Sequence, residues 1–107
     1  MSWNEDVANP LGDLQQRAKN AAAIANDQSL PRSERVLQSL QAFAVVQLTG
    51  LPPGICRAVE KHFVAVNQVL AKYHLEEDED YEQMTESDLQ EILNILKNSA
   101  ARIARGK

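Results

Sequence analysis

The chain has 107 residues, of which 44% are hydrophobic, and its formal net charge is −4 at pH 7. This length predicts a single domain over residues 1–107, and the lack of any apolar run near ~20 residues argues against a membrane span. The N-terminal residues lack a secretory-signal pattern, and Cys56 is the single cysteine, so an internal disulfide is excluded and a cytoplasmic location is expected.

The N-terminal part of the sequence predicts a short arm followed by a helix. Residues 1–9 contain Trp3, which we interpret as an anchor by which the arm covers the core. Asn9-Pro10 fits a helix cap followed by a first-turn proline, so we expect a helix over about residues 10–26. Its apolar face is mostly alanine, which favours helix formation but buries little area per residue. Such a face permits the close approach of another helix, either in the same chain or in a second copy.

Two segments with apolar stripes lie on either side of the glycine- and proline-containing sequence 50–54. In the first, about residues 31–49, apolar side chains recur at spacings of three and four, which is the period of one helix face. In the second, about residues 53–74, the spacing is the same but the stripe is wider, so this helix is expected to be contacted on more than one side. Gly50 suits a left-handed residue at the end of a helix. The sequence therefore predicts a central helical hairpin.

An acidic tract follows the hairpin. It is made up of six acids within seven positions, namely Glu76, Glu77, Asp78, Glu79, Asp80 and Glu82. Carboxylates are unfavourable at the negative end of a helix dipole, so residues 75–84 are expected to form a solvated acidic loop. A calcium loop is disfavoured, because the glycine and the last glutamate of an EF-hand are missing. A solubilising spacer and a docking site for a basic partner, including the basic end of a second copy, both remain open.

The last helix has the clearest start signal in the chain. Thr85 is expected to cap it, and Met84 and Leu89 are placed for a hydrophobic staple. Apolar residues follow at helical spacing to about residue 104, and basic residues fall in the final turns, where they complement the helix dipole. Together with the earlier segments, this pattern predicts an all-α, four-helix bundle-like domain.

No set of residues in the sequence matches a catalytic or metal-binding pattern. His62 and His74 lack partners at the spacings that would build a metal site on facing helices. Cys56 lies beside Arg57, but no base with an orienting group is recognisable, so burial as a small hydrophobe is favoured. Phosphate loops and hydrolase motifs are also missing. We therefore expect a non-enzymatic protein without a metal or cofactor.

The preferred functional hypothesis is a protein–protein interaction or regulatory module that self-associates, most simply as a homodimer. The candidate contact residues come from the second and fourth helices: Leu40, Phe43, Leu93 and Leu96. The first alternative is a helical nucleic-acid-binding or transcription-regulating factor, although the overall acidity argues against it. It would use the basic side chains Arg57, Lys61, Lys72, Arg102 and Arg105. The second alternative is a binder of a small apolar ligand between the helices.

Overall fold

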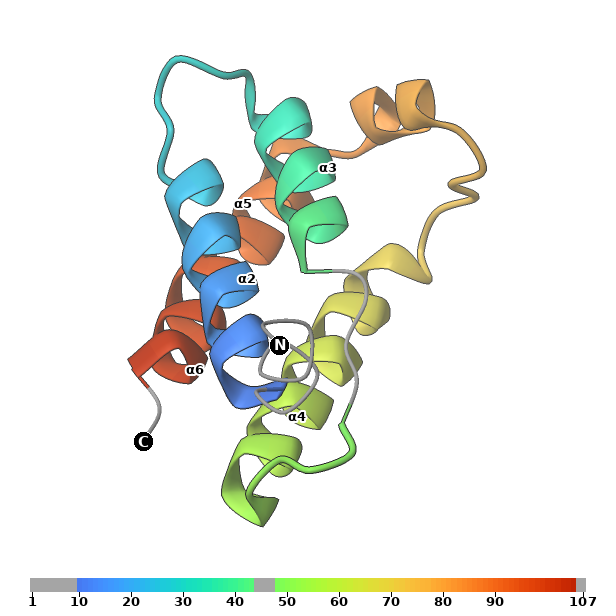
Figure 1. Ribbon diagram of the computed structural model, residues 1–107. Helices are drawn as coiled ribbons and strands as arrows, with labels where there is room; N and C mark the ends of the chain where they lie inside the picture. Colours follow the sequence, from blue (N-terminus) through green and yellow to red (C-terminus); the bar gives the residue numbers. More distant parts are fainter. Residues whose placement is uncertain (1–9, 44–47, 106–107) are drawn as a thin grey trace.

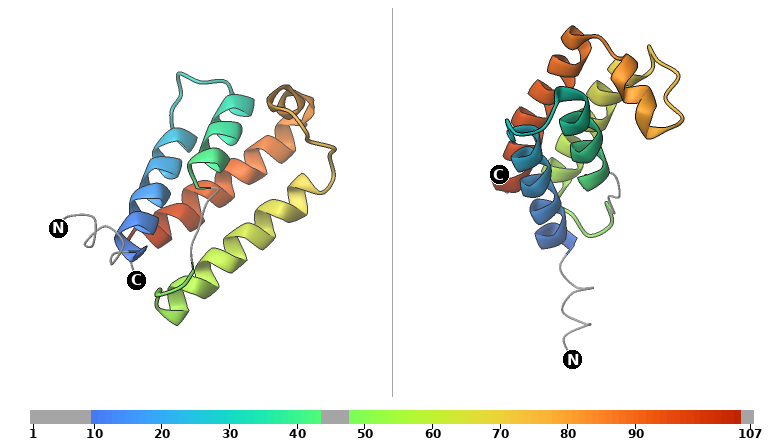
Figure 2. Two further views of the ribbon diagram at one scale, coloured as in Figure 1. Left: turned by 45° about the vertical axis from the view of Figure 1, so that its right-hand side comes forward. Right: turned by 90° about the horizontal axis from the view of Figure 1, so that it is seen from above.

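The computed structural model describes residues 10–43 and 48–105, and these residues form helices and turns without a β-strand. The helices are α2 (Pro10–Ala25), α3 (Arg32–Ala42), α4 (Pro53–Leu70), the 3-10 helix η1 (Asp78–Gln83), α5 (Glu86–Ile95), the π-helical segment η2 (Leu96–Ala100) and α6 (Ala101–Arg105). The last three follow one another without a break and form one C-terminal helical stretch (Figure 2). The predicted all-α, bundle-like domain is confirmed. Within the described ranges, no helix has the length and apolar character needed to cross a membrane.

The C-terminal stretch is the element on which the other helices pack. α2 and α3 lie side by side, and each contacts this stretch, while α4 lies along it as well (Figure 1, Figure 2). The main contacts of α3 are with α2, α5 and η1, and those of α4 are with α5, η2 and α6. Both helices of the predicted hairpin are therefore present, but they do not pack mainly on each other. α3 packs chiefly against α2 and then against α5, whereas α4 packs on the C-terminal stretch.

The first helix of the predicted hairpin ends earlier than its sequence suggests. A helix was expected to reach residue 49, but α3 ends at Ala42, and Thr49 lies in a turn with Gly50. Gly50 has a φ of 87°, and a Cβ at this position would lie 3.3 Å from Cγ of Pro10. The left-handed backbone and the contact with the start of α2 both favour glycine here. Residues 44–47 and the predicted N-terminal arm, 1–9, lie outside the described residues.

The core consists of two apolar clusters that meet along the C-terminal stretch. One cluster joins α2, α4 and α6, and the other joins α3, α4 and α5. Ala18, Ala21 and Ala25 have no exposed surface. The alanine face of α2 therefore allows neighbouring helices of the same chain to approach closely, which answers the question that the sequence left open.

The acidic tract is partly helical, so the prediction of a solvated loop over residues 75–84 is wrong for Asp78–Gln83. Glu77 and Asp80 form a capping box at the start of η1. The backbone N–H groups of Glu76 and Glu77 donate to Oδ2 of Asp80 at 2.8 and 2.9 Å, and these hydrogen bonds lower the pKa of Asp80. Glu77 and Asp80 thus stabilise the N-terminus of η1, where the helix dipole favours negative charge. The acidic tract does more than end α4.

Candidate functional site

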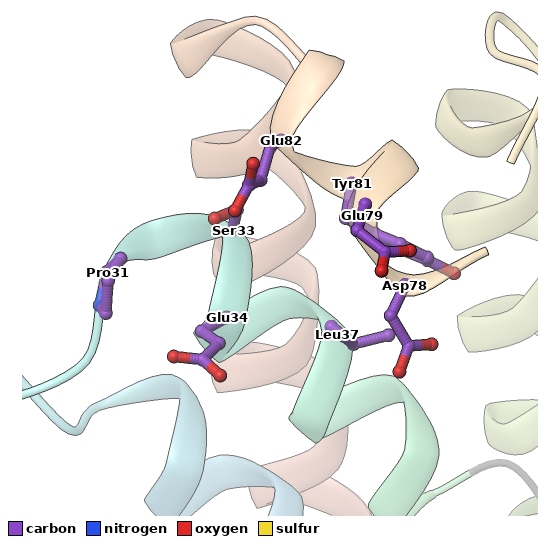
Figure 3. Close-up of a pocket in the computed structure, with 8 residues that line it drawn as sticks. All are labelled: Pro31, Ser33, Glu34, Leu37, Asp78, Glu79, Tyr81 and Glu82. Atoms are coloured by element: carbon purple, nitrogen blue, oxygen red, sulfur yellow. The ribbon is translucent and has the colours of Figure 1, made fainter.

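The acidic tract faces α3 across a groove. Two adjoining hollows, of about 330 and 240 Å³, lie between α3 and the η1 region, and both are lined by Leu37, Asp78 and Tyr81. The apolar lining residues are Leu37, Leu40, Leu75 and Tyr81, and the carboxylates around them are Glu34, Glu76, Glu77, Asp78, Glu79 and Glu82. Figure 3 shows the hollow of about 330 Å³, with its lining residues from α3 opposite those from η1. We call this surface the α3/η1 groove; it has an apolar floor and an anionic rim.

Among the described residues, the rim carboxylates have few positively charged partners. No lysine or arginine lines either hollow among the described residues. The described basic side chain that pairs with the rim is the exposed His74, whose Nε2 lies 2.9 Å from Oε1 of Glu76. Arg32, at the start of α3, pairs with Glu86 instead. The groove therefore presents uncompensated negative charge, which favours a cationic partner and raises its rate of encounter.

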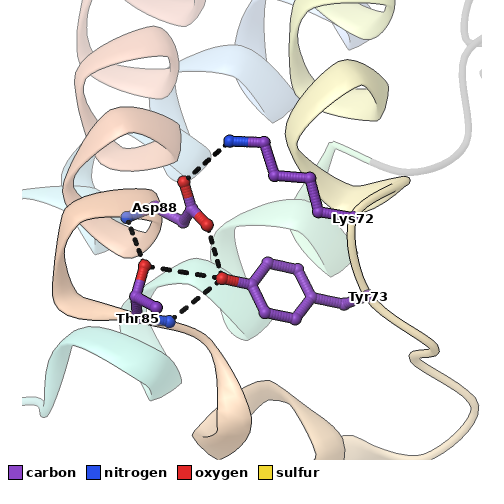
Figure 4. A network of polar contacts seen from close by, with 4 residues as sticks. All are labelled: Lys72, Tyr73, Thr85 and Asp88. Carbon is purple, nitrogen blue, oxygen red and sulfur yellow. Dashed lines mark hydrogen bonds and ion pairs between the residues drawn. The ribbon is translucent and has the colours of Figure 1, made fainter.

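A polar network fixes the position of the acidic tract by joining the end of α4 to the start of α5 (Figure 4). Nζ of Lys72 lies 3.1 Å from Oδ1 of Asp88, and the hydroxyl of Tyr73 donates to Oδ2 of the same carboxylate. The backbone N–H of Thr85 donates to the Tyr73 hydroxyl at 3.2 Å. These hydrogen bonds, first that from Tyr73 and then that from Lys72, lower the pKa of Asp88. Both ends of the segment that carries η1 are thereby tied to the bundle.

The predicted start of the last helix is confirmed. Oγ1 of Thr85 accepts from the backbone N–H of Asp88 at 3.1 Å, and Met84 and Leu89 are buried in one cluster. In the reciprocal half of a capping box, the carboxylate would accept from the Thr85 N–H. The Tyr73 hydroxyl accepts this N–H, while Asp88 bonds to Tyr73 and Lys72. The sequence indicated the cap, but it gave no sign that the Tyr73 hydroxyl would accept the Thr85 N–H.

Thr85→Ala is expected to lower the free energy of unfolding by about 1 kcal/mol, because it removes the side-chain oxygen that caps α5. Urea denaturation followed by circular dichroism measures this loss. Thr85→Ser keeps the oxygen and serves as the matched control, with an expected change of less than about 0.5 kcal/mol. Equal losses in the two variants would show that the cap does not stabilise the helix.

The predicted interaction residues are mostly unavailable to a partner. Phe43 is 1% exposed, and Leu93 and Leu96 are 0% exposed. These three side chains belong to the core clusters, so the prediction that they form a self-association seam is corrected. Leu40 is half-buried and lines the α3/η1 groove. Sequence periodicity identified their apolar face correctly, but it could not show that this face is covered within the chain.

The basic candidates are dispersed over the surface. Arg57 and Lys61 line one hollow of about 340 Å³ on the outer face of α4. Lys72 is held by Asp88, and this ion pair raises the pKa of its ammonium group. Arg102 and Arg105 are exposed on α6. Arg57 and Lys61 therefore lie together on α4, whereas Lys72 forms an ion pair with Asp88 of the same chain.

The candidate reactive side chains do not converge in the described part of the chain. Sγ of the half-buried Cys56 lies 3.6 Å from the carbonyl oxygen of Leu48 and 3.8 Å from that of Leu51. His62 is 1% exposed and packs against Phe43 and Phe63 at ring-centroid distances of 5.0 and 5.2 Å. Burial lowers the pKa of this imidazole to about 4. Among residues 10–43 and 48–105, no group of three or more His, Cys, Asp or Glu side chains is placed to hold a metal ion.

Comparisons with protein-family models, with curated proteins and with solved structures found no match for this chain. The described residues form an all-α bundle with an apolar groove rimmed by carboxylates.

Proposed function

We propose that this protein is a non-enzymatic interaction module whose α3/η1 groove binds a basic, amphipathic segment of a partner protein. The observation that carries the proposal is the groove itself, with leucine and tyrosine side chains on its floor and with rim carboxylates that no lysine or arginine of the described residues pairs with. Burial of the apolar floor would provide most of the affinity, and the rim would select cationic partners and speed their association. We place this function in the cytoplasm, which suits the free thiol of Cys56.

The arrangement of the floor favours a helical or extended partner segment rather than a compact ligand. The two hollows adjoin along α3, with Leu37 in both and Leu40 one turn further along. A partner helix places apolar side chains on one face at spacings of three and four, and such a face can fill two neighbouring hollows. Lysine or arginine side chains that flank this face would then meet the carboxylates of α3 and η1.

Binding of a fluorescent helical peptide with one leucine face and flanking lysines tests this function. We expect the wild-type chain to bind the peptide, with an affinity that falls as salt is added, because salt screens exposed charges. Glu34→Gln/Glu79→Gln removes two rim charges and is expected to raise the dissociation constant about tenfold. Leu37→Ser is expected to weaken binding as well, because it removes an apolar side chain that both hollows share.

The matched control for the rim is Asp13→Asn/Glu91→Gln, which also removes two negative charges, at exposed positions outside the groove. This control is expected to bind the peptide as the wild type does. Equal weakening by the two double variants would mean that net charge alone attracts the peptide, and a Leu37→Ser variant with unchanged affinity would remove the apolar floor from the proposal.

A further inference from the structure

The outer face of α4 has the chemistry that the α3/η1 groove would accept. Arg57, Lys61 and Val64 lie on this face around a hollow of about 340 Å³, together with Glu60, Ala65 and Gln68. Val64 is 57% exposed, an unusual position for a large hydrophobic side chain in this chain. Among the described residues, no carboxylate forms an ion pair with Arg57 or Lys61. This face is an exposed, basic and partly apolar stripe on one helix.

We infer that the partner of the α3/η1 groove is a second copy of this chain, docked through the outer face of its α4. This inference rests on the proposed function of the groove and names its occupant. Arg57, Lys61 and Val64 follow one another at spacings of four and three, so one side of a single helix offers two cations and an apolar side chain. The groove offers the complementary set, with carboxylates around leucine and tyrosine.

The two surfaces can be used at the same time. The α4 hollow shares no lining residue with the two hollows of the groove. One copy can therefore accept a neighbour in its groove while its own α4 docks in the groove of another copy. This contact joins two different surfaces, so it produces a two-fold dimer when two copies make it reciprocally, and rings or open filaments when they do not. Association is expected to increase as the concentration rises.

Sedimentation velocity of the full chain over a range of concentrations tests the inference. We expect the wild type to form dimers or larger species, and added salt to reduce them. The groove variant Glu34→Gln/Glu79→Gln and the face variant Arg57→Ser/Lys61→Ser are each expected to weaken association about tenfold. An equimolar mixture of the two variants keeps one intact groove and one intact face, so it is expected to form a 1:1 complex and nothing larger.

The matched control for the face is Lys19→Ser/Arg102→Ser, which removes two exposed positive charges on α2 and α6 and is expected to associate as the wild type does. All four altered residues of the groove and face variants are exposed, so circular dichroism should report an unchanged fold. A wild type that stays monomeric while its groove still binds the peptide overturns the self-pairing and leaves the proposed function standing. A wild type that neither self-associates nor binds the peptide overturns the proposed function and the self-pairing together. If the control variant weakens association as much as the face variant does, the self-pairing is overturned.

Discussion

Leu93→Ala is expected to lower the free energy of unfolding by about 2–5 kcal/mol. Leu93 has no exposed surface and lies in the cluster that joins α3, α4 and α5. Truncation to alanine leaves a cavity that the packed neighbours fill only in part, so the loss exceeds the transfer free energy of the missing atoms. For a chain of this length, the melting temperature is expected to fall by roughly 10 °C or more. Thermal and urea denaturation followed by circular dichroism measure both quantities.

Val64→Ala is the matched control, because Val64 is 57% exposed and its truncation is expected to change stability by less than about 0.5 kcal/mol. The comparison also separates the two roles that have been assigned to Leu93. A seam residue between copies would lose association on truncation and leave the stability of the isolated chain nearly unchanged. That result would contradict the burial of Leu93 and restore the interpretation made from sequence.

The helices were predictable because burial against a neighbour imposes a local period on the sequence. The buried residues of α4 are Ile55, Val59, His62, Val66 and Val69, at alternating spacings of four and three. This period identifies the face that is covered but not the element that covers it. The sequence therefore suggested that α3 and α4 cover each other, whereas α3 packs mainly against α2 and α4 packs mainly against the C-terminal stretch. For the same reason, Leu93 and Leu96 were predicted to contact a second copy, although helices of the same chain cover them.

The end of α3 was mispredicted for a related reason. Leu48 continues the apolar spacing of the helix, but it is 36% exposed and lies beyond the helix in the turn that leads to Gly50. An apolar residue at the right spacing does not need to belong to the helix when a nearby glycine allows the chain to reverse. Helical spacing of apolar residues is a local pattern, so it does not show where one helix ends and the next element begins.

The α3/η1 groove could not have been found from the sequence. Its two walls are about forty residues apart in the chain and meet because the polar network of Tyr73 and Asp88 fixes the segment between α4 and α5. One local signal was available, since Glu77 and Asp80 have the spacing of a capping box and could have predicted η1. We did not use this signal, because a tract with so many carboxylates is usually a solvated spacer.

His62 is the residue whose replacement is expected to stabilise the chain. It is 1% exposed, and neither ring nitrogen has a hydrogen-bond partner among the described residues. A buried polar atom without a partner costs about 1–3 kcal/mol, so His62→Leu, which has a similar size and no polar atom, is expected to raise the free energy of unfolding by about 1 kcal/mol or more at neutral pH. Urea denaturation near neutral pH measures this gain.

The stability of the wild type is also expected to depend on the protonation of His62. Burial lowers the pKa of the folded imidazole from 6.5 to about 4, so between these values the unfolded chain binds a proton that the folded chain does not. The contribution of His62 to the free energy of unfolding is therefore constant above the unfolded pKa and falls as the pH drops from 6.5 towards 4. At 1.36 kcal/mol for each pKa unit, the full loss is about 3 kcal/mol.

Comparison of the wild type with His62→Leu over this pH range isolates the contribution of the imidazole. The pKa values of Asp27, Asp80 and Asp88 are also lowered in the folded chain, so their stabilisation is lost as the pH falls through their folded pKa values. That loss is common to both proteins and cancels in the difference between them. The difference should grow as the pH falls below 6.5 and level off below about 4, where the folded imidazole is protonated as well. Parallel profiles would mean that His62 is not buried without a partner, because an exposed or hydrogen-bonded imidazole would not resist protonation in the folded state.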